Sequence, residues 1–260
     1  MKEVRILING LETNYKIAGS GPAILVLHGW GGSSDSWVKI QEILSEKGYQ
    51  VITPDFPGFG ATANPPVAWG VEEYADFVLR FAEKLELDKF FLLGHSFGGR
   101  IAIKFSALHP NKLKSLILVG SAGLQRSKSW SLRQRVVIKG LKFFHFLAKL
   151  PILNIFHNSL RRAIYIFSGT GDYYAIKSPV MKETFKKVIE EDLFDCLPQI
   201  KNKTLVVWGE KDNLTPQSIA HLLKEKIADS ELAIIPGVGH SPHLKAPEQL
   251  SETILKFLNK

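Results

Sequence analysis

The sequence predicts an α/β fold in which a mostly parallel sheet carries helices on both faces. Short apolar runs without polar alternation recur along the chain, which is typical of strands that are buried on both sides. Amphipathic helical patterns lie between these runs. Because strands and helices alternate, we expect right-handed βαβ units joined into one open sheet.

The first element is a predicted β-hairpin. Residues 4–8 and 13–18 are short runs separated by Asn9-Gly10, a dipeptide that tolerates positive φ in tight hairpin turns. Further strands are expected at residues 23–27, 51–53, 90–93, 116–119, 204–208 and 231–235. Helices are expected at residues 36–47, 71–85, 99–109, 217–228 and 247–258. The hairpin and these segments make up an α/β core of residues 1–122 and 198–260.

Residues 123–197 interrupt the alternation. This segment has helical patterns without clear strands and is rich in aromatic and basic residues. An insertion at the carboxyl ends of parallel strands lies over the ligand crevice of such a sheet. We therefore expect a helical cap, with an apolar substrate pocket lined by aromatic side chains. The candidates are Phe143, Phe144, Tyr165, Phe167 and Tyr173.

Composition limits the class of protein. Of 260 residues, 45% are apolar and 22% are charged, as in a soluble chain with a large core. No secretory signal or membrane-spanning run is recognised, and the single cysteine, Cys196, favours a reducing compartment. We expect a cytoplasmic protein, monomeric or homodimeric, without stable membrane insertion.

The net charge of +8 is unevenly distributed. Residues 122–200 contain thirteen basic and six acidic side chains, and this difference accounts for seven of the eight charges. Such an excess of basic side chains is most often found on a surface that faces solvent. Positive charge also attracts anionic ligands, so a substrate ester that bears an anionic group is a further possibility. No nucleic-acid-binding module is recognised, and no nucleic-acid partner is expected.

The strongest motif is Gly94-His95-Ser96-Phe97-Gly98, which follows a predicted strand and precedes a predicted helix. A nucleophile in a tight strand-turn-helix needs glycines two positions before and after it, because side chains there collide. Ser96 is therefore the candidate nucleophile. The backbone amide of Phe97 is a candidate oxyanion donor.

A serine hydroxyl needs a base, for which histidine has a suitable pKa. We choose His240, in the glycine-rich loop after the last predicted strand, over two competitors. His243 is expected to line the loop or contact solvent, and His95 is expected to pack inside the turn. Asp212, after the strand at 204–208, is preferred to Glu210 as the acid that orients the base.

The second oxyanion donor is expected from the loop His28-Gly29-Trp30-Gly31-Gly32, which follows the strand at 23–27. We assign it to the backbone amide of Trp30. His28 is expected to order this loop and to contribute to the substrate pocket. The order Ser96, Asp212, His240 differs from the chymotrypsin-like and subtilisin-like orders.

These motifs, together with Asp55-Phe56-Pro57-Gly58, resemble the α/β-hydrolase superfamily over essentially the whole chain. The chain looks like compact bacterial carboxylesterase-like members with a helical cap between the sixth and seventh strands. This resemblance implies an eight-stranded sheet and hydrolysis of a small-molecule ester through an acyl-enzyme. It implies no metal and no organic cofactor.

The resemblance leaves other chemistries open. Dehalogenases and epoxide hydrolases of this superfamily use an aspartate nucleophile, which Ser96 argues against. Carbon-carbon bond hydrolases share the triad but typically carry asparagine before the nucleophile and tryptophan after the histidine, where this chain has His95 and Ser241. Acyltransferases, cofactor-free haloperoxidase-like members and a non-catalytic ligand-binding scaffold remain alternatives.

Overall fold

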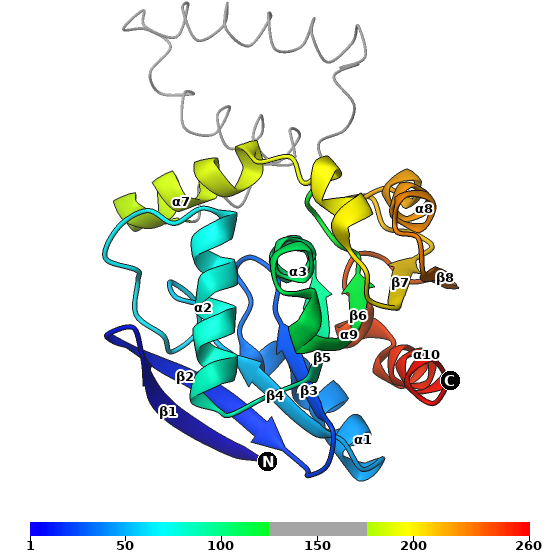
Figure 1. Ribbon diagram of the computed structural model, residues 1–260, viewed down its shortest axis with the longest axis horizontal. Coiled ribbons are helices and arrows are strands. Elements are labelled where there is room, and N and C mark those ends of the chain that lie inside the picture. Colours follow the sequence, from blue (N-terminus) through cyan, green and yellow to red (C-terminus); the bar gives the residue numbers. More distant parts are fainter. Residues whose placement is uncertain (125–175) are drawn as a thin grey trace, which may run out of the picture.

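The computed structural model describes residues 1–124 and 176–260. Eight strands in these residues form one sheet in the order β1-β2-β4-β3-β5-β6-β7-β8 (Figure 1). The strands are β1 (Lys2–Ile8), β2 (Leu11–Ala18), β3 (Ala23–Leu27), β4 (Gln50–Pro54), β5 (Phe90–His95), β6 (Leu113–Val119), β7 (Thr204–Gly209) and β8 (Ser230–Ile235). The β1–β2 and β2–β4 pairs are antiparallel and the others are parallel. The predicted mostly parallel, eight-stranded sheet is confirmed.

The opening hairpin has the predicted turn. Ile8 pairs with Leu11 across Asn9 and Gly10, whose φ angles are 48° and 82°. Positive φ at both central residues gives the turn a twist that matches the flanking strands.

The predicted helices are present with shifted limits. They are α1 (Val38–Glu46), α2 (Val71–Lys84), α3 (Phe97–Leu108), α8 (Gln217–Lys226) and α10 (Pro247–Leu258). A 3₁₀ turn, η1 (Ser34–Trp37), replaces the first residues predicted for α1. Ser33 precedes this turn, and its hydroxyl accepts a hydrogen bond from the Asp35 amide at 3.3 Å. Two short elements were not predicted, η2 (Pro110–Lys112) and α9 (Pro242–Lys245), and each begins with a proline, which suits a first helical position.

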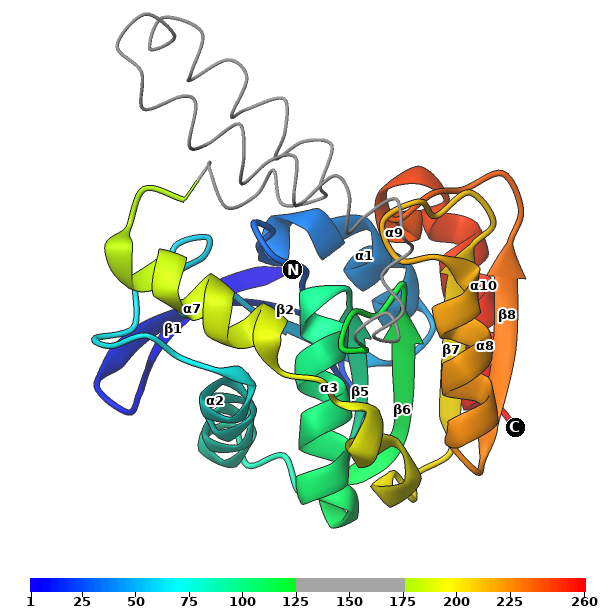
Figure 2. The same cartoon turned by 90° about the horizontal axis from the view of Figure 1, so that it is seen from above.

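The sheet separates two hydrophobic cores. Along β3, Leu25 and Leu27 face the core shared with α2, α3 and α8, while Ile24 and Val26 face the core shared with α1 and α10. Figures 1 and 2 show these two groups of helices on opposite sides of the sheet. Burial of both faces explains why the strands appear as continuous apolar runs in the sequence.

The described part of the predicted insertion contains α7 (Pro179–Glu190) and η4 (Phe194–Gln199). The buried side chains of Met181, Val188 and Leu197 belong to the same core as α2 and α3. Thr184 Oγ1 accepts a hydrogen bond from the backbone amide of Trp69 at 3.1 Å. The segment that leads back to β7 is therefore packed directly on the α/β unit.

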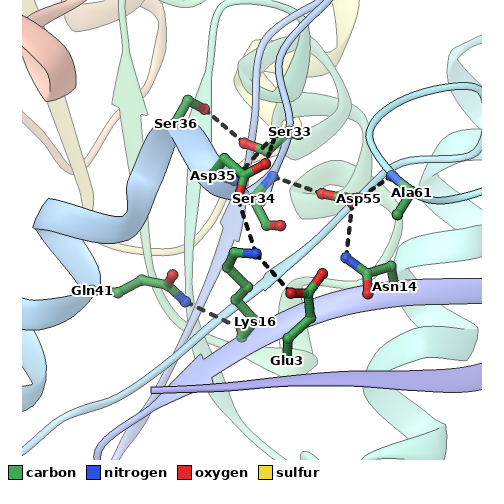
Figure 3. Close-up of polar contacts among 10 residues, drawn as sticks. All are labelled: Glu3, Asn14, Lys16, Ser33, Ser34, Asp35, Ser36, Gln41, Asp55 and Ala61. Atoms are coloured by element: carbon green, nitrogen blue, oxygen red, sulfur yellow. Dashed lines mark hydrogen bonds and ion pairs between the residues drawn. The ribbon is translucent and has the colours of Figure 1, made fainter.

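A buried carboxylate, Asp55, joins the loops that follow β3 and β4 (Figure 3). Its Oδ1 accepts a hydrogen bond from the amide of Ser34 at 2.6 Å. Its Oδ2 accepts from Asn14 Nδ2 at 3.0 Å and from the amide of Ala61 at 2.9 Å. Gly60 has a φ of 55°, and a Cβ there would lie 2.2 Å from Oδ2, so the loop closes around the carboxylate only with glycine.

Burial by itself acts to raise the pKa of Asp55, but the hydrogen bonds from Ala61, Ser34 and Asn14 outweigh it and lower the pKa. The carboxyl is therefore ionised at neutral pH. At the exposed end of the same network, Lys16 Nζ lies 2.9 Å from Asp35 Oδ1 and 3.3 Å from Glu3 Oε2 (Figure 3). The ion pair between Lys16 and Asp35 connects β2 with the start of η1.

We expect Asp55→Asn to lower the free energy of unfolding at neutral pH by about 2 to 3 kcal/mol, because an amide cannot accept from all three donors. The lowered pKa means that the contribution of Asp55 is complete above about pH 4, the value of a free aspartate, and is lost as the pH falls through the folded-state pKa. Urea denaturation of both proteins checks this, and their difference should shrink on acidification. Asp35→Asn is the control, since its side chain is 77% exposed and its loss should cost less than about 1 kcal/mol. A constant difference between the wild type and Asp55→Asn down to pH 3 would contradict the assignment.

Candidate active site

Ser96 lies in the turn between β5 and α3 and has a φ of 52°, which is uncommon for a residue with a side chain. Its amide donates to the carbonyl of Val119 at 3.1 Å, and its carbonyl accepts from the amides of Arg100 at 3.1 Å and Ala122 at 3.0 Å. Ser96 is partly exposed, whereas His95 and Phe97 beside it are buried. Backbone hydrogen bonds thus hold Ser96 in a strained conformation with access to solvent.

The glycines around Ser96 are required by close backbone contacts, as predicted. A Cβ on Gly94 would lie 2.4 Å from the carbonyl oxygen of Gly98. A Cβ on Gly98 would lie 2.2 Å from the carbonyl oxygen of Leu27. A larger residue at either position forces the backbone apart, so the tight turn depends on both.

The structure brings Asp212 and His240 into direct contact at the carboxyl ends of β7 and β8. His240 Nδ1 lies 2.8 Å from Asp212 Oδ2. The Asp212 side chain is completely buried, and that of His240 is 16% exposed. Because a carboxylate only accepts, Nδ1 carries the proton of a neutral ring, and Nε2 is left as the basic atom.

Thr215 also holds the carboxylate of Asp212, a contact that the sequence analysis missed. Its amide donates to Asp212 Oδ1 at 2.9 Å and its hydroxyl donates to Oδ2 at 2.8 Å. The amide of Leu214 donates to Oδ1 at 2.9 Å. An aspartate followed two and three residues later by such donors is a common turn arrangement, which is the signal that could have identified Thr215.

These contacts determine the charge of Asp212. Burial acts to raise its pKa, but the hydrogen bonds from His240 and Thr215 more than compensate and lower it. Asp212 is therefore ionised at neutral pH. It can stabilise a positive charge that develops on the imidazole of His240.

The alternative acid and base candidates have other partners. Glu210 Oε2 accepts from the amide of Gly237 at 2.7 Å, on an exposed part of the loop. His243 is buried and stacks on Trp37 with ring centroids 4.4 Å apart. Of the two alternatives expected for it, lining the loop or contacting solvent, solvent contact was wrong. Burial, and then His240, lower the pKa of His243 to about 4. The carbonyl of His240 lies 2.8 Å from His95 Nε2.

The loop with the second candidate oxyanion donor lies against Ser96. A Cβ on Gly29 would lie 3.4 Å from the Cβ of Ser96. The next residue, Trp30, packs edge-on against Phe97, with ring centroids 5.2 Å apart, and against Phe185 of α7, at 4.9 Å. Within the described residues, the backbone amides of Trp30 and Phe97 donate no hydrogen bond. Two free amides are thus available beside the partly exposed Ser96.

His28 orders this loop, as expected. Its Nε2 accepts from the amide of Phe56 at 3.0 Å, so Nδ1 carries the proton and donates to the carbonyl of Gly29 at 2.8 Å. Its side chain has no exposed surface, and burial lowers its pKa. Both ring nitrogens are thus used within the loop, and a contribution of His28 to the substrate pocket stays a prediction.

A cavity of about 360 Å³ opens beside Trp30, within the size range of small-molecule sites. Its described lining includes Phe59, Met181, Asn64 and Lys177. A cavity of about 420 Å³ between α1 and α10 contains none of the candidate residues, so its larger size does not make it the site. The predicted pocket residues lie outside the described part of the chain; they are Phe143, Phe144, Tyr165, Phe167 and Tyr173.

Ser96 and the Asp212–His240 pair occupy the same edge of the sheet without a direct hydrogen bond. In the described residues the Ser96 hydroxyl has no hydrogen-bond partner. Catalytic contacts of this kind often tighten only when substrate binds. No group of three His, Cys, Asp or Glu side chains suited to a metal ion is found in residues 1–124 and 176–260.

The sequence model of a family described as alpha/beta hydrolase fold matches residues 22–247. The chain belongs to this family. The match extends from the start of β3 to the start of α10 and includes all the candidate residues. None of the described helices is long and apolar enough to cross a membrane.

Relatives within the family have different activities. Monoacylglycerol lipase ABHD6 of Homo sapiens is 27% identical over 259 residues, which covers 92% of this chain and 76% of the lipase. The 2-hydroxy-6-oxo-2,4-heptadienoate hydrolase of Pseudomonas putida is 25% identical over 247 residues, which covers 90% of this chain and 88% of that enzyme. The crystal structure of a membrane phospholipase A, a bacterial virulence factor, superposes with a TM-score of 0.78 at 25% identity and covers 99% of this chain and 86% of that one.

We expect Thr215→Val to lower kcat/KM for a hydrolysed substrate by about fivefold, because one hydrogen bond to Asp212 is worth roughly 1 kcal/mol. Thr215→Ser, which keeps the hydroxyl, should retain most of the wild-type value. Steady-state kinetics of the three proteins checks this. Equal rates for the valine and serine variants would show that the hydroxyl does not support Asp212.

Proposed function

We propose that this member of the α/β-hydrolase fold family is a serine hydrolase of carboxylic esters. The observation that carries the proposal is the 2.8 Å contact between His240 Nδ1 and Asp212 Oδ2 at the sheet edge where Ser96 protrudes. This contact leaves His240 Nε2 free to act as a base toward a hydroxyl. Neither histidine next to it, His95 nor His243, competes for the proton, since burial lowers the pKa of both.

In the proposed acylation step, Ser96 Oγ attacks the ester carbonyl carbon while His240 Nε2 accepts the hydroxyl proton. The carbonyl oxygen becomes an oxyanion, to which the amides of Phe97 and Trp30 donate. Each such donor typically lowers the barrier by about 2.7 to 4 kcal/mol. Asp212 stabilises the resulting imidazolium without taking its proton.

The tetrahedral intermediate then collapses, and His240 gives its proton to the departing alkoxide. An acyl-enzyme on Ser96 and a free alcohol result. In the second step, water attacks the acyl carbon and gives a proton to His240, which returns it to Ser96 as the carboxylic acid leaves. The net reaction consumes one ester and one water.

Three observations support an ester with an apolar acyl part. The described lining of the cavity beside Trp30 includes the side chains of Phe59 and Met181. The human relative is a monoacylglycerol lipase, and the superposed bacterial structure is a phospholipase A. We further propose that residues 123–197 form a cap over the site, consistent with the packing of α7 against Trp30 through Phe185.

Carbon-carbon bond hydrolysis on the same triad is the second candidate. It is favoured by the similarity to the Pseudomonas putida 2-hydroxy-6-oxo-2,4-heptadienoate hydrolase. His95 and Ser241 argue against it, because carbon-carbon bond hydrolases typically have asparagine and tryptophan at these positions. Acyl transfer differs from ester hydrolysis only in the acceptor that attacks the acyl-enzyme.

We expect the protein to hydrolyse p-nitrophenyl esters with a maximum at one chain length between acetate and palmitate. Ser96→Ala should lower kcat/KM by about 10⁴-fold or more, since the nucleophile is lost. Release of p-nitrophenolate and labelling of Ser96 by a fluorophosphonate probe measure the two properties separately. His221→Ala on the exposed face of α8 serves as a control and should match the wild type.

Each outcome decides between the candidates. Ester hydrolysis that Ser96→Ala does not reduce would exclude the proposed nucleophile. Labelling of Ser96 without hydrolysis of any ester would favour carbon-carbon cleavage or acyl transfer, to be tested with a dienoate ring-cleavage product and with alcohol acceptors. Absence of both labelling and hydrolysis would favour a ligand-binding scaffold without turnover.

A further inference from the structure

His95 contacts the backbone of the residue that carries the candidate base. Its Nε2 lies 2.8 Å from the carbonyl oxygen of His240. A carbonyl oxygen only accepts hydrogen bonds, so Nε2 carries the proton and Nδ1 is the unprotonated nitrogen. The residue just before Ser96 thus donates directly to the main chain of His240.

The same ring is enclosed by the other loops of the site. His95 is 5% exposed, and its ring centroid lies 4.4 Å from that of His243 and 5.0 Å from that of His240. Behind them, His243 stacks on Trp37. A Cβ at Gly29 would lie 3.0 Å from His95 Nδ1. The ring of His95, which belongs to the Ser96 turn, therefore packs between this turn and the loops of His240 and Gly29.

His95 remains neutral in this position. Burial is the main cause that lowers its pKa well below the ordinary value, followed by the proximity of His243, His240 and, more weakly, His28. The hydrogen bond to the carbonyl of His240 acts in the opposite direction but does not outweigh these causes. The ring is therefore a neutral imidazole that donates from Nε2.

We propose that His95 is a positioning residue of the reaction, which fixes the His240 loop relative to Ser96 through its Nε2–H to carbonyl hydrogen bond. This inference rests on the proposed triad, because it matters only if His240 acts on Ser96. The hydrogen bond joins the nucleophile turn to the base loop at one residue from Ser96 and at His240 itself. Ser96 and His240 have no direct hydrogen bond in the described residues, so their separation depends on contacts between their loops, of which this hydrogen bond is one.

The test uses two substitutions of matched shape, His95→Gln and His95→Met. Glutamine keeps an N–H donor at nearly the reach of Nε2, whereas methionine has the same length and no donor. We expect kcat to fall about tenfold in His95→Met, with KM nearly unchanged, and to recover most of its value in His95→Gln. The rate of fluorophosphonate labelling of Ser96 should follow kcat. The exposed His221→Met is the control for the loss of a histidine.

A second measurement does not depend on turnover. The proton shared by His240 Nδ1 and Asp212 should give a low-field imidazole signal by NMR, which Asp212→Asn identifies by its loss. We expect this signal in the wild type and in His95→Gln, and its broadening or loss in His95→Met.

The outcomes separate this inference from the proposed function. Equal kcat and labelling rates for the glutamine and methionine variants, or an unchanged NMR signal in His95→Met, would overturn the positioning role. A wild-type protein that neither hydrolyses esters nor labels at Ser96 would overturn the proposed function, and the NMR comparison would then decide the role of His95 alone. If His95→Met and a third variant, His95→Phe, both fail to fold while His95→Gln folds, the hydrogen bond serves stability and not positioning.

Discussion

The candidate site depends on the strained turn at Ser96. A non-glycine residue at φ 52° is unfavourable by roughly 1 to 3 kcal/mol, and the backbone keeps it there by hydrogen bonds to Val119, Arg100 and Ala122. The glycines on either side allow β3, β5 and α3 to approach more closely than any side chain permits. The buried sheet thus supplies the stability that holds a partly exposed hydroxyl in one orientation.

The ionisable groups around this turn fall into two kinds. Asp212 and Asp55 are buried carboxylates whose hydrogen-bond donors lower their pKa, so both stay charged. His28, His95 and His243 are buried rings whose pKa is lowered by burial, so all three stay neutral. His240 differs from these three rings in its direct contact with a charged carboxylate, since its Nδ1 lies 2.8 Å from Asp212 Oδ2.

The helix α7 connects the insertion to the site. Phe185 packs on Trp30, and Met181 lines the cavity beside it. At the other end of α7, the buried guanidinium of Arg100 donates to the carbonyl of Glu191, and Lys104 Nζ lies 3.1 Å from the carboxylate of Glu191. Since Arg100 belongs to α3, the helix that starts just after Ser96 also anchors the segment that borders the cavity beside Trp30.

The sequence by itself determined the fold class, the hairpin and the turn at Ser96. These features depend on local constraints: apolar runs for strands with two buried faces, Asn9-Gly10 for positive φ, and Gly94 and Gly98 for close backbone contact. It also identified Asp212 and His240 as partners, because each follows a strand whose carboxyl end lies at one edge of a parallel sheet.

Only the tertiary structure decided how the remaining polar groups are used. Thr215, Asp55 and His95 act through hydrogen bonds to atoms of other loops, and His28 and His243 are removed from solvent by residues distant in the sequence. Such partners depend on which loops meet at the sheet edge and on how completely water is excluded there. A linear pattern records residue type and spacing, but burial and the choice of hydrogen-bond partner are properties of the packed chain.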